Sequence, residues 1–380
     1  MGSHGPLAGV TVVENASYIS GPFAGQLLAQ LGADVVKVEA PGSGDPFRRW
    51  GGTSSGRRTR PQFASLNVGK RSVALDLRSV DGRAGYLDLV GTADAVLENF
   101  RPGTLDRLGV GEAEVRAQNP QIVYCTVTGF GPSGPYASRP AYDAIVQAVS
   151  GLWSLLSPLA QPRAVGPPTS DTLGGLNAAL AVAAGLAGVA RGGTGPRRFD
   201  VSMLAASLGV LGSSVANRAA GGEVETPYSR GRRSHSMAFR ARDGAPLAVH
   251  LSSPEKFWVR LTEVVGRDDL REDPRFATYP VRLQHFDELL DELGRAFAAR
   301  PRADWLDLLH AADVPAAPVH TIDEVIADLH VRETGLLVAV HGPEGEPFLV
   351  PRGAIAYDGD ADALTPLVPA LGGLHPPVPP

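Results

Sequence analysis

The chain has 380 residues, of which 43% are apolar, and a formal net charge of −5. This length predicts two domains, or one large domain with an insertion, and the apolar fraction is sufficient for a full core. The mildly acidic balance argues against a nucleic-acid-binding protein, because such proteins gather positive charge to contact phosphates. The single cysteine, Cys125, excludes an internal disulfide and favours a reducing compartment.

The N-terminus has no charged segment followed by an apolar run, so the sequence does not predict a secretory signal. Residues 1–4 are interpreted either as native sequence or as the remnant of an expression tag. The longest apolar run is rich in alanine and glycine and is interrupted by Asn177, which argues against a membrane-spanning helix. We therefore expect a cytoplasmic protein without a membrane partner.

Short β-rich runs alternate with helical patterns in the first half of the chain. Strands are predicted at residues 10–13, 34–39, 72–77, 95–99 and 121–128, and helices at residues 22–31, 80–90 and 111–119. Strands that alternate with helices are typical of βαβ units. The sequence therefore predicts an α/β fold with a mostly parallel sheet.

Two long helices, predicted at residues 172–191 and 201–219, end this alternation. The polar, glycine-rich residues 221–243 are interpreted as a linker. A strand at 246–251 and helices at 254–265, 283–299 and 302–312 follow, and β patterns return at 316–320, 336–340 and 347–350. We expect a large domain over residues 5–220, a smaller, mostly helical α+β domain over 221–315, a return to the large domain over 316–372, and a loose tail over 373–380.

Several common site motifs are absent from the sequence. The segment after the first predicted strand lacks G-x-G-x-x-G, which argues against a dinucleotide-binding enzyme. Residues 68–72 lack the upstream glycine of a phosphate-binding loop, and no G-x-S-x-G marks a hydrolase nucleophile. The nine histidines are scattered without ligand spacing, so no metal site is predicted.

Asp171 stands at the predicted start of a long apolar helix. Thr169 and Ser170 are candidate caps of this helix, and the helix dipole would keep a carboxylate in the first turn ionised. Gly174 and Gly175 would let a ligand approach the backbone. From this stretch alone, Asp171 is either a charge partner of its own helix or a functional carboxylate at the mouth of a buried helix.

Polar and basic residues follow another predicted strand directly. Asn99, Phe100 and Arg101 stand where a strand of an open α/β sheet meets its ligands, and Arg107 is close behind. Lys70 and Arg71 form a basic pair that is interpreted either as solvated surface or as a contact to a phosphate-rich ligand.

Several motifs occur in order along nearly the whole chain. They are G-P-F-A at 21–24, L-G-A-D-V-V-K-V-E at 31–39, N-x-x-K-R-S at 67–72, E-N-F-R-P-G at 98–103, Y-D at 142–143, Asp171, and D-P-R-F at 273–276. Together they resemble the family III coenzyme A transferases, a family that includes formyl-CoA transferase, carnitine CoA-transferase and alpha-methylacyl-CoA racemase.

The resemblance implies a Rossmann-like large domain formed by both chain ends, an inserted smaller domain, and an interlocked homodimer. It implies that coenzyme A passes from an acyl-CoA donor to a carboxylic acid through a covalent intermediate on Asp171, with coenzyme A thioesters as substrates and no permanently bound cofactor. The residues that the family motifs match to coenzyme A contacts are Tyr18, Lys70, Arg71, Asn99, Phe100 and Arg107. Tyr142 and Asp143 are matched to the substrate pocket.

Two alternatives stay open. A racemase needs an acid/base group on each side of the α-carbon. Where the racemases carry histidine and glutamate, this chain has Tyr142 and Ser253, which are poor bases near neutral pH. Against the transferase, the chain lacks the glycine-run loop that shields intermediates in formyl-CoA transferase. The second alternative is a non-catalytic coenzyme A-binding protein, against which the presence of Asp171 argues.

Overall fold

The computed structural model describes residues 5–51, 59–195, 197–251, 254–357 and 367–373. They form two compact units: unit 1 takes the described residues of 1–153, 164–216 and 332–380, and unit 2 takes those of 154–163 and 217–331. The sequence predicts domain boundaries at residues 221 and 315 and does not separate residues 154–163 from the large domain.

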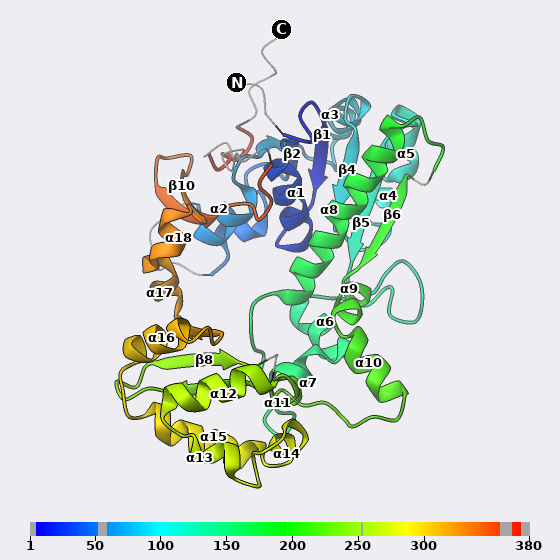
Figure 1. The fold of residues 1–380 in the computed structure, drawn as a ribbon. Helices are drawn as coiled ribbons and strands as arrows, with labels where there is room; N and C mark the ends of the chain where they lie inside the picture. Colours follow the sequence, from blue (N-terminus) through cyan, green and yellow to red (C-terminus); the bar gives the residue numbers. More distant parts are fainter. Residues whose placement is uncertain (1–4, 52–58, 196, 252–253, 358–366, 374–380) are drawn as a thin grey trace. The chain divides into compact units, whose positions relative to one another are not determined.

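Unit 1 is built on a six-stranded parallel sheet (Figure 1). In sheet order the strands are β3 (Arg71–Ala74), β2 (Asp34–Glu39), β1 (Thr11–Asn15), β4 (Ala95–Glu98), β5 (Val123–Thr128) and β6 (Arg198–Ser202). Chain order reverses between β1 and β4, and ligands of open α/β sheets bind beside the carboxyl ends of the strands at such a point. The predicted α/β class is confirmed.

Alternating side chains of the strands face two separate layers of helices. Val12 packs with α1 (Ser20–Gln30) and α8 (Thr169–Ala190) on one face, where Cys125 is also buried. Val13 packs with α3 (Val80–Gly91) and α5 (Glu112–Gln118) on the other face. Because both faces are covered, the strands read as continuous apolar runs.

Both ends of the chain contribute to a smaller core in unit 1. The antiparallel pair β10 (Leu337–His341) and β11 (Pro347–Pro351) packs against η1 (Pro46–Arg49) and α2 (Pro61–Asn67). The buried members of this core are Phe47, Phe63, Ala64, Val68, Val340, Phe348, Val350 and Val368. Further helices of unit 1 are α4 (Thr104–Arg107), α6 (Asp143–Ser150) and α9 (Met203–Val210), and α10 (Gly212–Ala219) crosses the boundary to unit 2 after Ala216.

Two sequence-based predictions are wrong in this region. Residues 201–219 are not one helix, because residues 198–202 pair in parallel with β5 as the edge strand β6. The helix begins anew at Met203, where the Ser202 hydroxyl accepts from the backbone N–H of Ala205 at 3.2 Å. The proposed linker at 221–243 contains α11 (Ser229–Ser234) and β7 (Ser236–Arg240).

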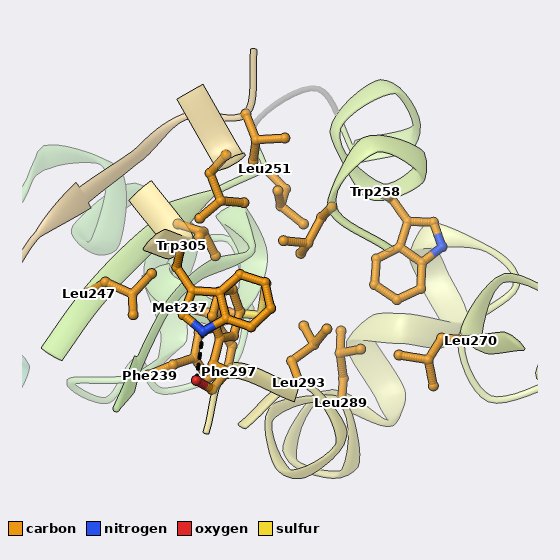
Figure 2. Packing of buried hydrophobic residues seen from close by; sticks show 14 of the residues in the cluster. Met237, Phe239, Leu247, Leu251, Trp258, Leu270, Leu289, Leu293, Phe297 and Trp305 are labelled. Carbon is orange, nitrogen blue, oxygen red and sulfur yellow. Dashed lines mark hydrogen bonds between the residues drawn. The ribbon is translucent and has the colours of Figure 1, made fainter. Parts of the chain in front are cut away.

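Unit 2 combines a three-stranded antiparallel sheet with helices. The sheet consists of β7, β8 (Pro246–His250) and β9 (Ala316–Pro318), and the helices include α12 (Pro254–Val265), α15 (Phe286–Phe297) and α16 (Arg302–Ala311). Figure 2 shows its aromatic core, in which the indole N–H of Trp305 donates to the carbonyl oxygen of Phe297 at 2.7 Å. The shorter helices are α13 (Asp269–Glu272), α14 (Tyr279–Gln284) and α17 (Ile322–Ala327), while α7 (Leu152–Leu156) and α18 (Leu329–Glu333) each span a boundary between the units.

Candidate active site

A cavity of about 340 Å³ lies in unit 1 at the carboxyl ends of β1, β4 and β5. Segments that are far apart in the sequence line it. They are Ser17, Tyr18 and Ser20 after β1; Pro46; Asn99, Phe100, Arg101 and Pro102 after β4; Val127, Thr128, Gly129 and Phe130 at the end of β5; Ala137, Arg139, Ala141 and Tyr142; Asp171 on α8; and Met203. The cavity therefore sits at the point where chain order in the sheet reverses.

Six of the predicted site residues meet in this cavity. They are Tyr18, Asn99, Phe100, Arg101, Tyr142 and Asp171. The rings of Tyr18 and Tyr142 meet edge to face, with centroids 6.2 Å apart. The site thus combines an acidic side chain with an aromatic wall.

Asp171 has an unusual electrostatic environment. Burial raises the pKa of its carboxyl to about 7, the nearby Asp143 carboxylate raises that pKa as well, and a hydrogen bond from the Ser20 side chain opposes both effects. The expectation that the helix dipole keeps Asp171 ionised is therefore wrong for pH values well below neutral. Perturbed carboxyl groups of this kind are common at catalytic sites.

The reason lies in Asp143, the first residue of α6, whose carboxylate contacts the N–H groups at the start of α8. Oδ1 of Asp143 accepts from the backbone N–H groups of Ser170 at 2.8 Å and of Asp171 at 3.1 Å. Its other oxygen accepts from Gln147 Nε2 at 2.5 Å. Asp143 therefore receives the stabilisation that a helix N-terminus offers to an anion.

Neither predicted cap of α8 fulfils that role. Thr169 and Ser170 belong to the helix itself, and Pro168, the residue before it, makes no capping hydrogen bond with its side chain. The Thr169 hydroxyl donates to the carbonyl oxygen of Pro167 at 3.1 Å, and Ser170 pairs with the Ser207 hydroxyl at 2.8 Å.

Gly174 and Gly175 serve helix packing and not ligand approach, contrary to the sequence-based expectation. A Cβ on Gly174 would lie 2.9 Å from Met203 Cγ, and one on Gly175 would lie 2.6 Å from the carbonyl oxygen of Ser20. Both glycines are buried inside α8. They let α9 and α1 approach the helix that carries Asp171.

The loop after β1 is held in a strained conformation. Tyr18 has a φ of +64°, in the left-handed region that side chains rarely adopt. Its backbone N–H donates to Asp45 Oδ1 at 3.2 Å, and the N–H of Ser17 donates to Asn99 Oδ1 at 2.9 Å. These two contacts fix the Tyr18 ring at the cavity.

Lys70 and Arg71 do not lie at this cavity, so the structure gives no support to direct contacts there. Lys70 is buried, and its Nζ donates to Glu14 Oε2 at 2.6 Å, to the carbonyl oxygen of Pro22 at 2.7 Å and to Asn67 Oδ1 at 3.0 Å. Arg71 pairs with Asp34 at the opposite, amino end of the sheet. An ammonium whose three hydrogens are already used has none left for a phosphate.

Arg107 is likewise outside the residues that line the cavity. It lies at the end of α4 and donates to the Thr104 hydroxyl at 3.1 Å.

Phe100 belongs to the cavity, and its backbone N–H donates to Glu98 Oε2 at 2.7 Å. Burial raises the pKa of Glu98 to about 7. Sequence reasoning missed Ser20 and Glu98, although Glu98 belongs to the motif that also contains Asn99.

These features define an α/β enzyme with a carboxyl group at the ligand-binding edge of its sheet. Residues 7–375 match the model of CoA-transferase family III. The chain is 34% identical over 343 residues to succinyl-CoA–D-citramalate CoA-transferase of Chloroflexus aurantiacus (89% of this chain, 84% of the relative), and 36% identical over 326 residues to acetyl-CoA:oxalate CoA-transferase of Acetobacter aceti (84% and 82%).

The fold matches solved structures over nearly the full chain. A CaiB/BaiF family protein from Brucella suis superposes with a TM-score of 0.85 at 33% identity and covers 97% of both chains. The chain therefore belongs to the family III coenzyme A transferases and is an enzyme of that class.

Proposed function

We propose that this enzyme transfers coenzyme A between an acyl-CoA donor and a carboxylic acid acceptor through covalent intermediates on Asp171. The observation that carries the proposal is the position of the Asp171 carboxyl in the cavity at the switch point of the sheet. Relatives that share about a third of the sequence are named as CoA-transferases acting on succinate, glutarate and oxalate.

In the first half-reaction, an Asp171 carboxylate oxygen attacks the thioester carbon of the donor. The C–S bond breaks, the coenzyme A thiolate leaves, and a mixed anhydride remains on Asp171. The thiolate then attacks the Asp171 Cγ and expels the donor acid as its carboxylate. Asp171 now carries coenzyme A as a thioester.

The second half-reaction runs the same steps in reverse order with the acceptor. Its carboxylate attacks the Asp171 thioester, releases the thiolate and forms a new anhydride. The thiolate attacks the acceptor's carbonyl carbon, which yields the new acyl-CoA and restores the Asp171 carboxylate. No proton is gained or lost over the cycle, because every nucleophile and leaving group is an anion.

The cavity supports this chemistry in two ways. Partial burial of Asp171 limits the access of water to an anhydride that water would hydrolyse. A carboxyl group with a pKa of about 7 is partly ionised at neutral pH and is more basic than an ordinary aspartate, which favours nucleophilic attack. Coenzyme A acts here as a substrate.

Trapping experiments test the proposal. Incubation with succinyl-CoA or acetyl-CoA and hydroxylamine is expected to leave a hydroxamate on the peptide that contains Asp171, detected by mass spectrometry. The Asp171→Ala variant is expected to lose the adduct and coenzyme A transfer together. An Asp171→Ala protein that transfers coenzyme A at the parent rate would refute the covalent route.

The racemase alternative receives less support from the site. Asp143 accepts three hydrogen bonds within the fold, which leaves it poorly placed to take a proton from a substrate. Tyr142 stands where the racemases carry histidine, and Ser253 lies outside the described residues. Deuterium exchange at the α-carbon of a 2-methylacyl-CoA would favour the racemase.

We further propose that the chain forms a homodimer through the outer surface of α8, α9 and α10. Exposed apolar side chains gather there: Leu176, Leu180, Leu208, Val210 and Val215. By length and composition α8 is also apolar enough to cross a membrane, and 33% of its most apolar window is buried. A second copy of the chain covering this surface would remove it from water. Leu180→Glu is expected to shift the mass measured by light scattering toward the monomer, whereas Val80→Glu, at an exposed position of α3, is not.

A further inference from the structure

Two tyrosine residues lie at the border between the Asp171 cavity and solvent. Tyr18 and Tyr142 both line the cavity, and their rings meet edge to face with centroids 6.2 Å apart. Each residue also has surface open to water, because they are 37% and 62% exposed, whereas Asp171 is only partly exposed. We propose that the Tyr18–Tyr142 pair determines reaction specificity: it keeps water from acyl intermediates on Asp171, so that they are transferred and not hydrolysed.

The loop that carries the Tyr18 ring is fixed by side chains from other strands. The Asn99 amide accepts from the N–H of Ser17 at 2.9 Å and donates to the carbonyl oxygen of the same residue at 2.8 Å. Asp45 Oδ1 accepts from the N–H of Tyr18 at 3.2 Å, and its other oxygen lies 3.0 Å from the fully buried Lys37 Nζ. Two successive residues of the loop are therefore each held in place.

This arrangement holds Tyr18 in a strained conformation. Its φ of +64° lies in the left-handed region, which glycine adopts without strain. A glycine at this position would remove the strain but would bring no ring to the cavity. Strain that persists where glycine would relieve it is common at functional sites, and here the feature that glycine cannot supply is the aromatic side chain.

The Tyr142 backbone is connected to the segment that carries the reacting carboxyl group. Its carbonyl oxygen accepts from the N–H groups of Ile145 at 2.9 Å and of Val146 at 3.1 Å, in the first turn of α6. The next residue, Asp143, accepts from the N–H of Asp171 at 3.1 Å. The start of α6 therefore holds the second ring at a fixed place relative to the start of α8.

The two rings form one apolar contact surface that continues into the core. Tyr18 lies between Tyr142 and Phe47, and its ring centroid is 6.3 Å from that of Phe47. Phe47 is a buried member of the smaller core of unit 1. Edge-to-face rings attract each other, and their carbon atoms offer water no hydrogen-bonding partner.

Hydrolysis is the side reaction that the rings oppose, and it presupposes the Asp171 intermediates of the proposed function. Water attacks the acyl carbon of the mixed anhydride, the C–O bond to Asp171 breaks, and the Asp171 carboxylate leaves. The water oxygen remains in the donor acid as part of its carboxylate. Of the two water protons, one neutralises the coenzyme A thiolate and the other passes to solvent. An acyl-CoA is thereby consumed without any transfer.

The ratio of hydrolysis to transfer tests the proposal. Succinyl-CoA and acetyl-CoA are the donors, release of free thiol without an acceptor measures hydrolysis, and formation of glutaryl-CoA from added glutarate measures transfer. Tyr18→Gly and Tyr142→Ala are each expected to raise this ratio by about tenfold, because either change opens the cavity to water. Tyr18→Phe keeps the ring and is expected to keep the parent's ratio.

A matched control and a folding control complete the experiment. Val149→Ala removes an exposed apolar side chain from α6, outside the residues that line the cavity, and is expected to leave the ratio unchanged. Tyr18→Gly is expected to fold even if Tyr142→Ala does not, because glycine tolerates the φ of this loop.

The outcomes separate this proposal from the proposed function. A parent protein that forms no Asp171 adduct would overturn the proposed function, and the role of the rings with it. If the parent forms the adduct and transfers coenzyme A, but folded Tyr18→Gly and Tyr142→Ala proteins keep its ratio of hydrolysis to transfer, the role of the rings alone is overturned. A rise in Tyr18→Phe as large as in Tyr18→Gly would also overturn it, because the ring would then not be the cause.

Discussion

Replacing Asp171 by asparagine is expected to stabilise the protein at neutral and higher pH. The ordinary pKa of this group is 3.8, and burial raises it to about 7 in the folded protein. Between these values the folded state holds a proton that the unfolded state has released. Stability therefore falls as pH rises through this window, and the loss is complete above pH 7.

The magnitude follows from the size of the window. A window of about three pH units lowers the free energy of unfolding of the parent by at most about 4 kcal/mol at pH 8. Because asparagine does not ionise, the variant is expected to avoid about 2 to 4 kcal/mol of this loss. Thermal unfolding at pH 8 and pH 5 measures the effect: the midpoint of Asp171→Asn is expected to exceed that of the parent at pH 8, with a smaller difference at pH 5. Asp88→Asn, at an exposed position on α3, is the control. Equal midpoints for Asp171→Asn and the parent at pH 8 would refute the reasoning.

Three further changes test other parts of the site. Asp143→Asn keeps an oxygen for the backbone N–H groups but removes the negative charge that lies near Asp171. The pKa of Asp171 should then fall, so the acid limb of kcat/KM is expected to move to lower pH by about one pH unit. A shift to higher pH would contradict this. Lys70→Met leaves Glu14 with one fewer buried cation and is expected to destabilise the fold by about 3–5 kcal/mol in urea titrations. The KM of the folded variant for acyl-CoA is expected to stay unchanged. A large increase in KM would instead indicate that Lys70 contacts coenzyme A directly. Gly175→Ala places a Cβ against the carbonyl oxygen at the start of α1, and both stability and kcat are expected to fall; an unaffected kcat would argue against close packing as the source of the site geometry.

Hydrophobic periodicity was sufficient to predict five of the six strands of the central sheet. Residues 34–39 form β2 as predicted, because a buried parallel strand leaves a continuous apolar run in the sequence. The edge strand β6 was not predicted, and its last two residues, 201–202, were assigned to the following helix, because residues 198–202 are only partly buried or exposed and carry no such run. Its strand character comes from hydrogen bonding to β5, a contact that local sequence does not contain.

The site was predictable where residues follow a strand directly. Asn99 and Phe100 could be placed at the carboxyl edge because β4 ends one residue earlier. Lys70 shows the opposite case, since its motif alone does not reveal that Glu14 lies within hydrogen-bonding distance. Asp143 is 28 residues from the N–H group of Asp171, so no local capping pattern could have identified it.

The packing of α8 and the chemistry of Asp171 have a common origin. If Asp171 itself capped the helix, the backbone N–H groups would hold it as a strongly stabilised anion, and a stabilised anion is a poor nucleophile. Because Asp143 accepts from those N–H groups, they do not stabilise the Asp171 carboxylate, and desolvation raises the pKa of the Asp171 carboxyl to about 7. Asp143 thus accepts from the N-terminal N–H groups of the helix and, under the proposed mechanism, leaves Asp171 as the nucleophile. The sequence left open whether Asp171 is a charge partner of its helix or a functional carboxylate, and in the structure it is Asp143 that contacts the N–H groups at the helix start.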